Sequence, residues 1–223
     1  MTDRNTTPAI QVEGIRMRFG ADTVIKDITC TWEAGKIHGI VGRNGSGKTV
    51  LMKCICGFLR PTRGQARVFG RTIGKDVDFA PDTGMLIEAP GFLPHETGMS
   101  NLLWLARLSG LKGRERVRAC IEMVGLDPNL KKGVGKYSMG MRQRLGIAQA
   151  LLDDPRLLIL DEPTNGLDKQ GVRDMHALLM CLKAQGKTVL LASHNPLDIS
   201  GLCDSVREMD GGVMSAAYKD ITI

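Results

Sequence analysis

A glycine-rich segment that ends in a lysine and a threonine is the strongest chemical signal in the sequence. It fits the pattern GxxxxGK[ST] and consists of Gly42, Arg43, Asn44, Gly45, Ser46, Gly47, Lys48 and Thr49. Glycines let backbone N–H groups close around phosphates, and the N-terminus of a following helix adds positive potential. Lys48 can reach the terminal phosphates of a nucleotide, and the Thr49 hydroxyl can ligate Mg²⁺. A simple glycine turn needs no Lys-Thr pair, so we predict a nucleotide site.

Two adjacent carboxylates form the second chemical signal. Asp161 and Glu162 directly follow the apolar run from Leu157 to Leu160. Asp161 can hold Mg²⁺ through water, and Glu162 can orient and deprotonate an attacking water molecule. An Asp-Glu pair also occurs at ordinary strand ends. Its presence in one chain with a phosphate loop favours a catalytic role.

The elements around these residues are those of a nucleotide-binding fold. Lys36 to Val41 is a short apolar run before the loop, and Thr49 to Phe58 has helical spacing after it. Further along the chain, helices and strands alternate, as helix Met141 to Leu152, strand Leu157 to Leu160, helix Lys169 to Ala184, strand Thr188 to Ala192 and a hairpin-like pair around Val206 to Ala217. This alternation predicts a mainly parallel sheet that is covered by helices on both faces.

Two further regions have their own patterns. Ile10 to Phe19 and Val24 to Trp32 alternate between apolar and polar residues, which predicts an antiparallel sheet at the start of the chain. A strand is also expected around Gln65 to Gly70, and the segment Met85 to Glu88 is followed by a Pro- and Gly-rich turn from Ala89 to Pro94. The spacing predicts helices from Thr97 to about Leu126. We therefore expect an α/β phosphate-loop core with an N-terminal antiparallel β subdomain and an inserted α-helical subdomain.

A third segment resembles the signature sequence LSGGQxQR of the ABC ATPase family. It consists of Tyr137, Ser138, Met139, Gly140, Met141, Arg142, Gln143 and Arg144. The resemblance extends, with all motifs in order, from Phe19 to His194. It implies one ABC ATPase domain over residues 1–223, with a nucleotide-binding core at 1–88 and 146–223 and a helical subdomain at 89–145. It also implies ATP and Mg²⁺ as ligands and a head-to-tail homodimer. Each ATP would lie between Lys48 of one subunit and Ser138 and Gly140 of the other.

The same resemblance suggests roles for residues outside the three motifs. Phe19 is similar to the aromatic residue that stacks on adenine, although an aromatic ring at this point also suits strand packing. The segment from Asn165 to Asp168 resembles the loop that crosses the dimer interface. His194 resembles the switch histidine that contacts the γ-phosphate and the catalytic glutamate, here Glu162. The other histidines, His38, His95 and His176, have no such context and are interpreted as structural or surface residues.

The chain departs from the family pattern at three places. Val50 follows the loop where a second hydroxyl residue is usual, so a side-chain contact to the phosphates is lost there. Met139 and Met141 replace a glycine and a glutamine of the signature. Glu88 stands where most members have a glutamine that links the Mg²⁺ site to the transmembrane partner. This glutamate and the signature segment together resemble the subgroup of bacitracin and lantibiotic self-protection exporters.

The resemblance implies an ATP-binding and ATP-hydrolysing subunit that powers a separate transmembrane permease, for export of or immunity to an antimicrobial peptide or drug. The alternative is a non-transport ABC ATPase that acts on ribosomes or nucleic acid. Translation-factor members usually have two nucleotide domains in one chain and DNA-repair members have long coiled-coil insertions, whereas neither occurs in this sequence. A small-molecule kinase with the same loop is disfavoured by the signature segment. The transported compound and the permease are not identified by the sequence.

Composition agrees with this interpretation. With 223 residues and 43% hydrophobic content, the chain can bury a sizeable core. No apolar run reaches the roughly 18 to 20 residues of a membrane span, and the N-terminus is polar, so we expect a cytoplasmic protein that is held at the inner face of the membrane through the permease. The six cysteines form no CxxC pair, which favours packed, reduced thiols. The net charge of +6 is only weakly clustered, so nucleic-acid binding is not expected.

Overall fold

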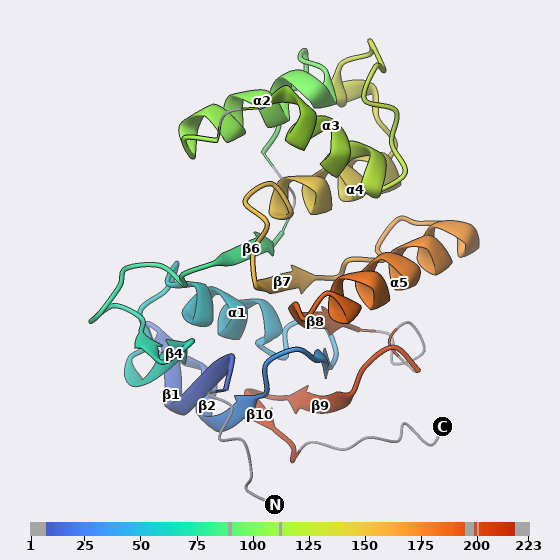
Figure 1. The fold of residues 1–223 in the computed structure, drawn as a ribbon. Coiled ribbons are helices and arrows are strands. Elements are labelled where there is room, and N and C mark those ends of the chain that lie inside the picture. The colour runs from blue at the N-terminus through green and yellow to red at the C-terminus, as the bar shows by residue number, and fades with distance from the viewer. Residues whose placement is uncertain (1–7, 89–90, 112, 195–198, 200, 217–223) are drawn as a thin grey trace, which may run out of the picture.

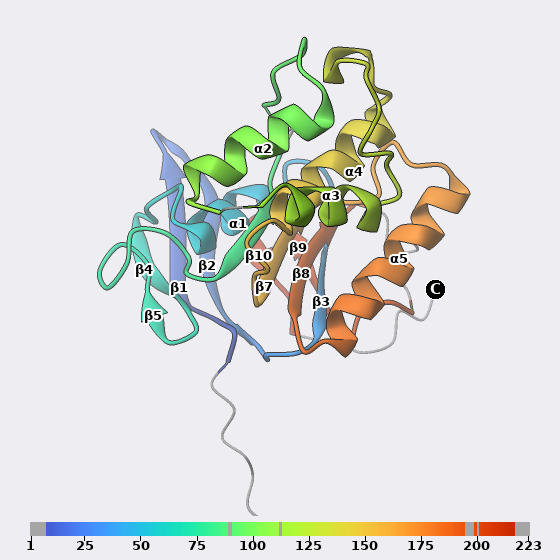
Figure 2. The same cartoon turned by 45° about the horizontal axis from the view of Figure 1, so that its top comes forward.

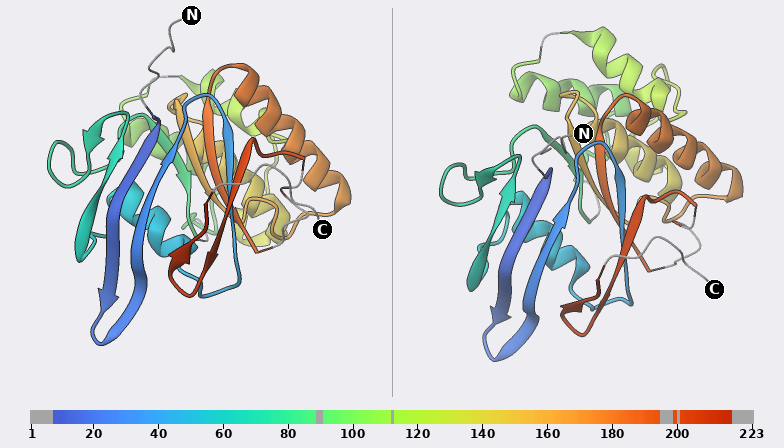
Figure 3. Two further views of the ribbon diagram at one scale, coloured as in Figure 1. Left: turned by 90° about the horizontal axis from the view of Figure 1, so that it is seen from below. Right: turned by 60° about the horizontal axis from the view of Figure 1, so that its bottom comes forward.

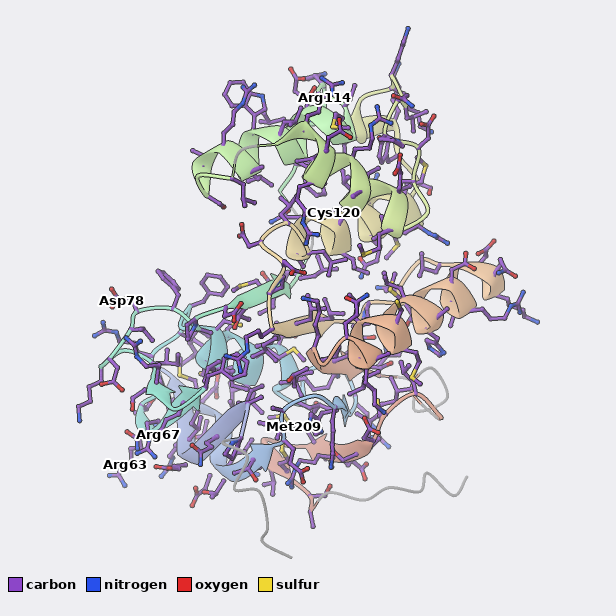
Figure 4. The ribbon with its side chains drawn as sticks, in the orientation of Figure 1. Arg63, Arg67, Asp78, Arg114, Cys120 and Met209 are labelled. Atoms are coloured by element: carbon purple, nitrogen blue, oxygen red, sulfur yellow. The ribbon has the colours of Figure 1, made fainter. Side chains whose placement is uncertain are left out.

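The first layer of the fold is an antiparallel sheet near the N-terminus. The computed structural model describes residues 8–88, 91–111, 113–194, 199 and 201–216. The sheet has the order β2-β1-β4-β5 and is built from β1 (Ile10–Phe19), β2 (Asp22–Trp32), β4 (Arg63–Val68) and β5 (Arg71–Thr72). Alternate residues of β1 are buried, so one face packs inward and the other meets solvent. Arg63 and Arg67 lie at the outer side of this sheet (Figure 4), where Arg67 pairs with Glu13.

The second layer is a mainly parallel sheet with the order β10-β9-β3-β8-β7-β6. Its strands are β3 (Ile37–Val41), β6 (Thr83–Leu86), β7 (Leu157–Asp161), β8 (Thr188–Ser193), β9 (Ser205–Asp210) and β10 (Val213–Met214). Only the β9–β10 pairing is antiparallel. Every residue of β3 and β8 is buried. Strands that are covered on both faces need continuous apolar runs, which is the pattern of these two segments.

Helix α1 (Lys48–Cys56) lies between the two sheets, and α5 (Lys169–Ala184) covers the opposite face of the parallel sheet (Figures 1 and 3). One apolar cluster joins α1 to the antiparallel sheet and to Ile40, Ile159 and Leu190 of the parallel sheet. A second cluster joins α5 and the helical subdomain to the other face of that sheet. The core therefore has two parts, and α1 is the central element of the first.

The helical subdomain stands beyond the β6 and β7 edge of the parallel sheet (Figure 2) and contains α2 (Gly98–Leu108), α3 (Arg114–Met123), the short 3-10 helix Val134–Lys136 and α4 (Met139–Ala150). The chain turns between α2 and α3 at Gly110, which has a φ of 75°. Arg116 donates to the carbonyls of Leu151 and Leu152 at the end of α4. Of the three arginines in α3, at positions 114, 116 and 118, Arg116 thus makes a structural contact.

Most of the expected elements are confirmed, and the bounds differ by a few residues. Strand β6 ends at Leu86, and Glu88 has a φ of 63°, which an extended strand does not contain. Ala89 and Pro90, within the expected turn, and Ala217, at the end of the expected hairpin, lie outside the described residues.

The cysteines and the helices agree with two further expectations. All six cysteines are free thiols, and four are buried, as Cys30, Cys54, Cys56 and Cys120. Burial raises the pKa of the Cys30 thiol to about 12. Within the described part of the chain, no helix is long and apolar enough to cross a membrane.

We predict that Gly84→Ala destabilises the fold by loosening the helical subdomain from β6. A Cβ atom at Gly84 would lie 1.9 Å from the carbonyl oxygen of Ala150, at the end of α4, and backbone cannot move aside as a flexible side chain can. We expect a loss of about 1–3 kcal/mol in the free energy of unfolding, measured by urea denaturation. The control is Gly91→Ala, where nothing lies within 4 Å of the added atom. Equal stability of both variants would contradict this packing.

Candidate nucleotide-binding and hydrolysis site

The phosphate loop connects β3 to α1, and close packing explains its glycines. Gly45 and Gly47 have φ values of 81° and 105°, in the region that favours glycine. A Cβ atom at Gly42 would lie 2.1 Å from the carbonyl oxygen of Met209, and one at Gly47 would lie 2.7 Å from Met209 Cε. Met209 belongs to β9 and is labelled in Figure 4. The loop is thus pressed against β9, and only glycine fits at these positions.

The loop is also held by backbone hydrogen bonds from distant segments. Gly42 N–H donates to Ser193 O at 3.3 Å, and Gly212 N–H, in the turn between β9 and β10, donates to Ser46 O at 3.2 Å. In contrast, Ser46 Oγ is buried and has no hydrogen-bond partner in the part of the chain that the structure describes. A buried hydroxyl without a partner is costly. A phosphate oxygen in the loop could supply that partner.

Lys48 is only 5% exposed and lies over its own loop. Its Nζ donates to Gly42 O at 2.6 Å and to Arg43 O at 3.2 Å, and it lies 4.0 Å from Glu162 Oε1. The ammonium group is therefore held between the loop and the catalytic candidate. It can exchange a carbonyl contact for a phosphate oxygen without leaving the site.

Thr49 and Asp161 meet at the side of the loop. Thr49 Oγ1, in the first turn of α1, donates to Asp161 Oδ2 at the end of β7, at 2.6 Å. Mg²⁺ prefers oxygen ligands and is usually held by one or two protein groups together with substrate phosphates and water. The two oxygens fit such a site.

Glu162 has a left-handed backbone, with a φ of 50°. Its N–H donates to Ala192 O at 2.9 Å, and its carbonyl accepts from Gln143 Nε2 of α4 at 2.8 Å. The ring nitrogen His194 Nδ1 lies 2.8 Å from Glu162 Oε2. The carboxylate is thus oriented by His194 and can accept a proton from a water molecule near Lys48.

A cavity of about 380 Å³ brings most of the predicted residues together. Asp161, Glu162 and Val24 line it with residues of the loop and of the first turn of α1, namely Asn44, Gly45, Ser46, Gly47, Lys48, Thr49 and Val50. Val24, which comes from β2, was not among the predicted site residues. Phe19 is 46% exposed at the end of β1 and does not line this cavity, so its adenine-stacking role stays a prediction.

A second cavity, of about 220 Å³, shares the two carboxylates with the first and is lined by Glu88, Met139, Gln143, Asp161, Glu162 and Asn165. Glu88 lies beside two further carboxylates in this cavity, so a metal ion or a cationic group is needed to offset the negative charge. Lys53 of α1 is such a group, because its Nζ lies 2.6 Å from Glu88 Oε1. Lys53 was missed, although it follows Thr49 by four residues and so shares its helix face.

The signature residues lie at the N-terminus of α4. Ser138 caps the helix, since its Oγ accepts from Met141 N–H at 3.1 Å. A Cβ atom at Gly140 would lie 2.7 Å from Gly166 O, so the helix start packs closely on the segment from Asn165 to Asp168. Neither Ser138 nor Gly140 lines the cavity around Lys48. Their predicted contact with ATP therefore requires a second subunit.

Comparisons with known proteins identify the family of the chain. A model of the family described as ABC transporter matches residues 25–165. The chain is 37% identical over 212 residues to the uncharacterized ABC transporter ATP-binding protein YybJ of Bacillus subtilis (strain 168), covering 95% of this chain and 97% of that protein. It is 39% identical over 199 residues to the bacitracin transport ATP-binding protein BcrA of Bacillus licheniformis, covering 88% of this chain and 65% of that relative.

The fold is similar to that of solved cassettes. The dimeric structure of MJ0796, a bacterial ABC transporter cassette, superposes with a TM-score of 0.84 at 22% identity, covering 94% of this chain and 98% of that one. The ADP conformation of MJ1267, an ATP-binding cassette of an ABC transporter, gives a TM-score of 0.82 at 22% identity and covers 96% of this chain and 92% of that one. The family match and these relatives, together with the phosphate loop, the paired carboxylates and the signature helix, show that the chain belongs to the ABC transporter family as an ATP-binding, ATP-hydrolysing cassette.

Proposed function

We propose that this ATPase works as a head-to-tail homodimer that powers a separate transmembrane permease in the export of an antimicrobial peptide such as bacitracin. The observation that carries the proposal is that Lys48, Glu162 and the Thr49–Asp161 pair line one cavity. His194 is not part of that lining, but its Nδ1 lies 2.8 Å from the Glu162 carboxylate. These groups come from three separate segments of the chain, at residues 48–49, 161–162 and 194, and each has a role in phosphoryl transfer to water.

The chemistry follows from the contacts of each side chain. The loop N–H groups, the helix N-terminus and Lys48 bind the phosphates of ATP. Thr49 and Asp161 would hold Mg²⁺, which, when bound, neutralises part of the phosphate charge. Glu162 orients the attacking water and accepts its proton, and His194 holds the carboxylate in place. Glu88 is proposed to exchange its contact with Lys53 for the metal site as the dimer cycles.

The proposal of a dimer rests on the position of the signature residues Ser138 and Gly140. Ser138 and Gly140 lie at the N-terminus of α4, where the helix dipole favours an anion. They do not line the cavity of their own chain. Facing the γ-phosphate in a partner subunit would give each ATP contacts from Lys48 of one chain and Ser138 of the other.

The proposed permease contact uses the boundary between the core (residues 1–88 and 146–223) and the helical subdomain (residues 89–145). A groove of about 220 Å³ lies there between β6, α2 and the end of α4, and Leu108 on its rim is 84% exposed. Trp104, on the same helix, is 55% exposed. The permease would hold the protein at the inner face of the membrane. The similarity to BcrA favours an antimicrobial peptide as the transported compound.

We predict that Glu162→Gln retains ATP binding but slows hydrolysis by roughly 10²- to 10⁴-fold, because it keeps the side-chain shape and removes the basic oxygen. The variant should accumulate as an ATP-bound dimer in size-exclusion chromatography. The control is Glu115→Gln, an exposed glutamate of α3. Hydrolysis by the Glu162 variant at the wild-type rate would remove this residue from catalysis.

A mixing experiment tests the shared site. We predict that Lys48→Ala and Ser138→Asp subunits are each inactive alone and regain activity when they are mixed, since a mixed dimer has one intact site. Aspartate can still cap α4 but repels the γ-phosphate. With random pairing, at most about a quarter of the wild-type rate returns, because half of the dimers are mixed and each has one site of two. Verified mixed dimers without activity would contradict the shared site.

A third prediction concerns Glu88 and Lys53. Glu88→Gln and Lys53→Met should each change hydrolysis by the isolated chain by no more than about fivefold, in line with the roughly 1 kcal/mol limit for an exposed ion pair. Both should reduce permease-coupled ATPase activity and peptide resistance in cells much more strongly. If coupling is normal while hydrolysis by the isolated Glu88 variant collapses, Glu88 is a catalytic residue rather than a coupling residue.

A further inference from the structure

Gln143 joins the signature helix to the backbone of the proposed catalytic base. It lies on α4 four residues after Met139, on the same face of the helix. Its Nε2 donates to the carbonyl oxygen of Glu162 at 2.8 Å. The same two residues of α4 line the second cavity beside Asp161 and Glu162.

The backbone of Glu162 requires such support. A non-glycine residue with a φ of 50° is strained and persists only where its surroundings hold it. The N–H side is fixed by Ala192 O of β8 at 2.9 Å, and the carbonyl accepts from Asn165 N–H at 3.1 Å. Asn165 belongs to the same short turn and moves with it. Gln143 is therefore the contact that fixes this carbonyl to a separate rigid element.

The packing around Gln143 makes α4 and this turn one unit. A Cβ atom at Gly166 would lie 2.6 Å from Met139 Cγ, so the Met139 side chain rests on the backbone of the turn. Further along the same helix, Arg144 donates to Val124 O of the helical subdomain at 2.8 Å and to Asp174 of α5 at 3.2 Å. A shift of α4 is thus conveyed to the turn that carries Glu162.

We propose that Gln143 is a positioning residue that sets the direction of the Glu162 carboxylate and makes it depend on the position of α4. The inference rests on the proposed function, in which Glu162 is the base and the start of α4 faces the ATP of the partner subunit. Binding of ATP in one site then orients the base in the other through Gln143. The two active sites of one dimer are then connected through the Gln143 side chain of each subunit.

The first test removes the donor and keeps the size. Gln143→Met should lower kcat roughly 10- to 100-fold, the effect of a small misplacement of a reacting group, while the Kd for MgATP changes less than about twofold. Gln185→Met is the control, since it also removes a side-chain hydrogen bond, to Cys181 on α5, away from the site. Thermal denaturation of both variants shows whether the fold is intact. An unchanged kcat for Gln143→Met overturns the proposal.

A double variant separates positioning from a general loss of structure. In the Glu162→Gln background, Gln143→Met should lower the residual rate by less than about twofold, because Gln143 acts through a group that is already absent. A full additional loss means that Gln143 acts elsewhere and overturns the proposal. If Glu162→Gln alone keeps the wild-type rate, the proposed function fails instead, so the two failures are distinguishable.

A charge variant gives a readout that structural damage does not. In Gln143→Glu the introduced carboxyl faces Glu162, Asp161 and Glu88, which favour its protonated form. Only the protonated form can donate to the Glu162 carbonyl. The ratio of variant to wild-type kcat should therefore rise as the pH is lowered from about 8 to 6, because protonation of the introduced carboxyl restores the donor. A ratio that does not depend on pH overturns the hydrogen-bond role.

Discussion

The burial of α1 between two sheets fixes the position of the groups that face the phosphates of a nucleotide. Leu51, Met52 and Ile55 are fully buried in a cluster that includes residues of both sheets. Protein interiors are close-packed and yield little, so the start of this helix cannot drift. Its free N–H groups and positive end therefore point permanently into the cavity. The phosphate loop, Thr49 and Lys53 all take their positions from this one packed helix.

Lysine side chains offset the negative charge of the carboxylates at the site. Asp161, Glu162 and Glu88 would repel one another if they were alone, and the structure places a cation beside two of them. Lys48 lies near Glu162, and Lys53 contacts Glu88. Lys48 also bonds to carbonyls of its own loop. Before a nucleotide binds, the protein thus supplies internal partners for charges that later serve phosphate and metal.

Much of the fold and the site could be predicted from the sequence because it depends on local patterns. Continuous apolar runs specify the parallel strands, and the spacing from Gly42 to Thr49 specifies the loop. The contacts of Glu88 with Lys53 and of Gln143 with Glu162 could not be predicted, because they join side chains from segments that only the tertiary fold brings together. The left-handed backbone of Glu162 could not be predicted either, since glutamate has no preference for that conformation. The roles of Phe19 and the dimer stay predictions.

The turn between β9 and β10 adds a consequence for the order of events during synthesis. The loop at residues 42–49 is pressed against Met209 and receives the Gly212 hydrogen bond, and β3 itself is flanked by β8 and β9. A ribosome delivers β9 and Gly212 more than 150 residues after the loop, which takes on the order of 10 s. During that time β9, against which the glycine-rich segment packs in the folded protein, has not been synthesised. The packing of the phosphate loop on β9 can therefore be completed only after most of the chain has been synthesised.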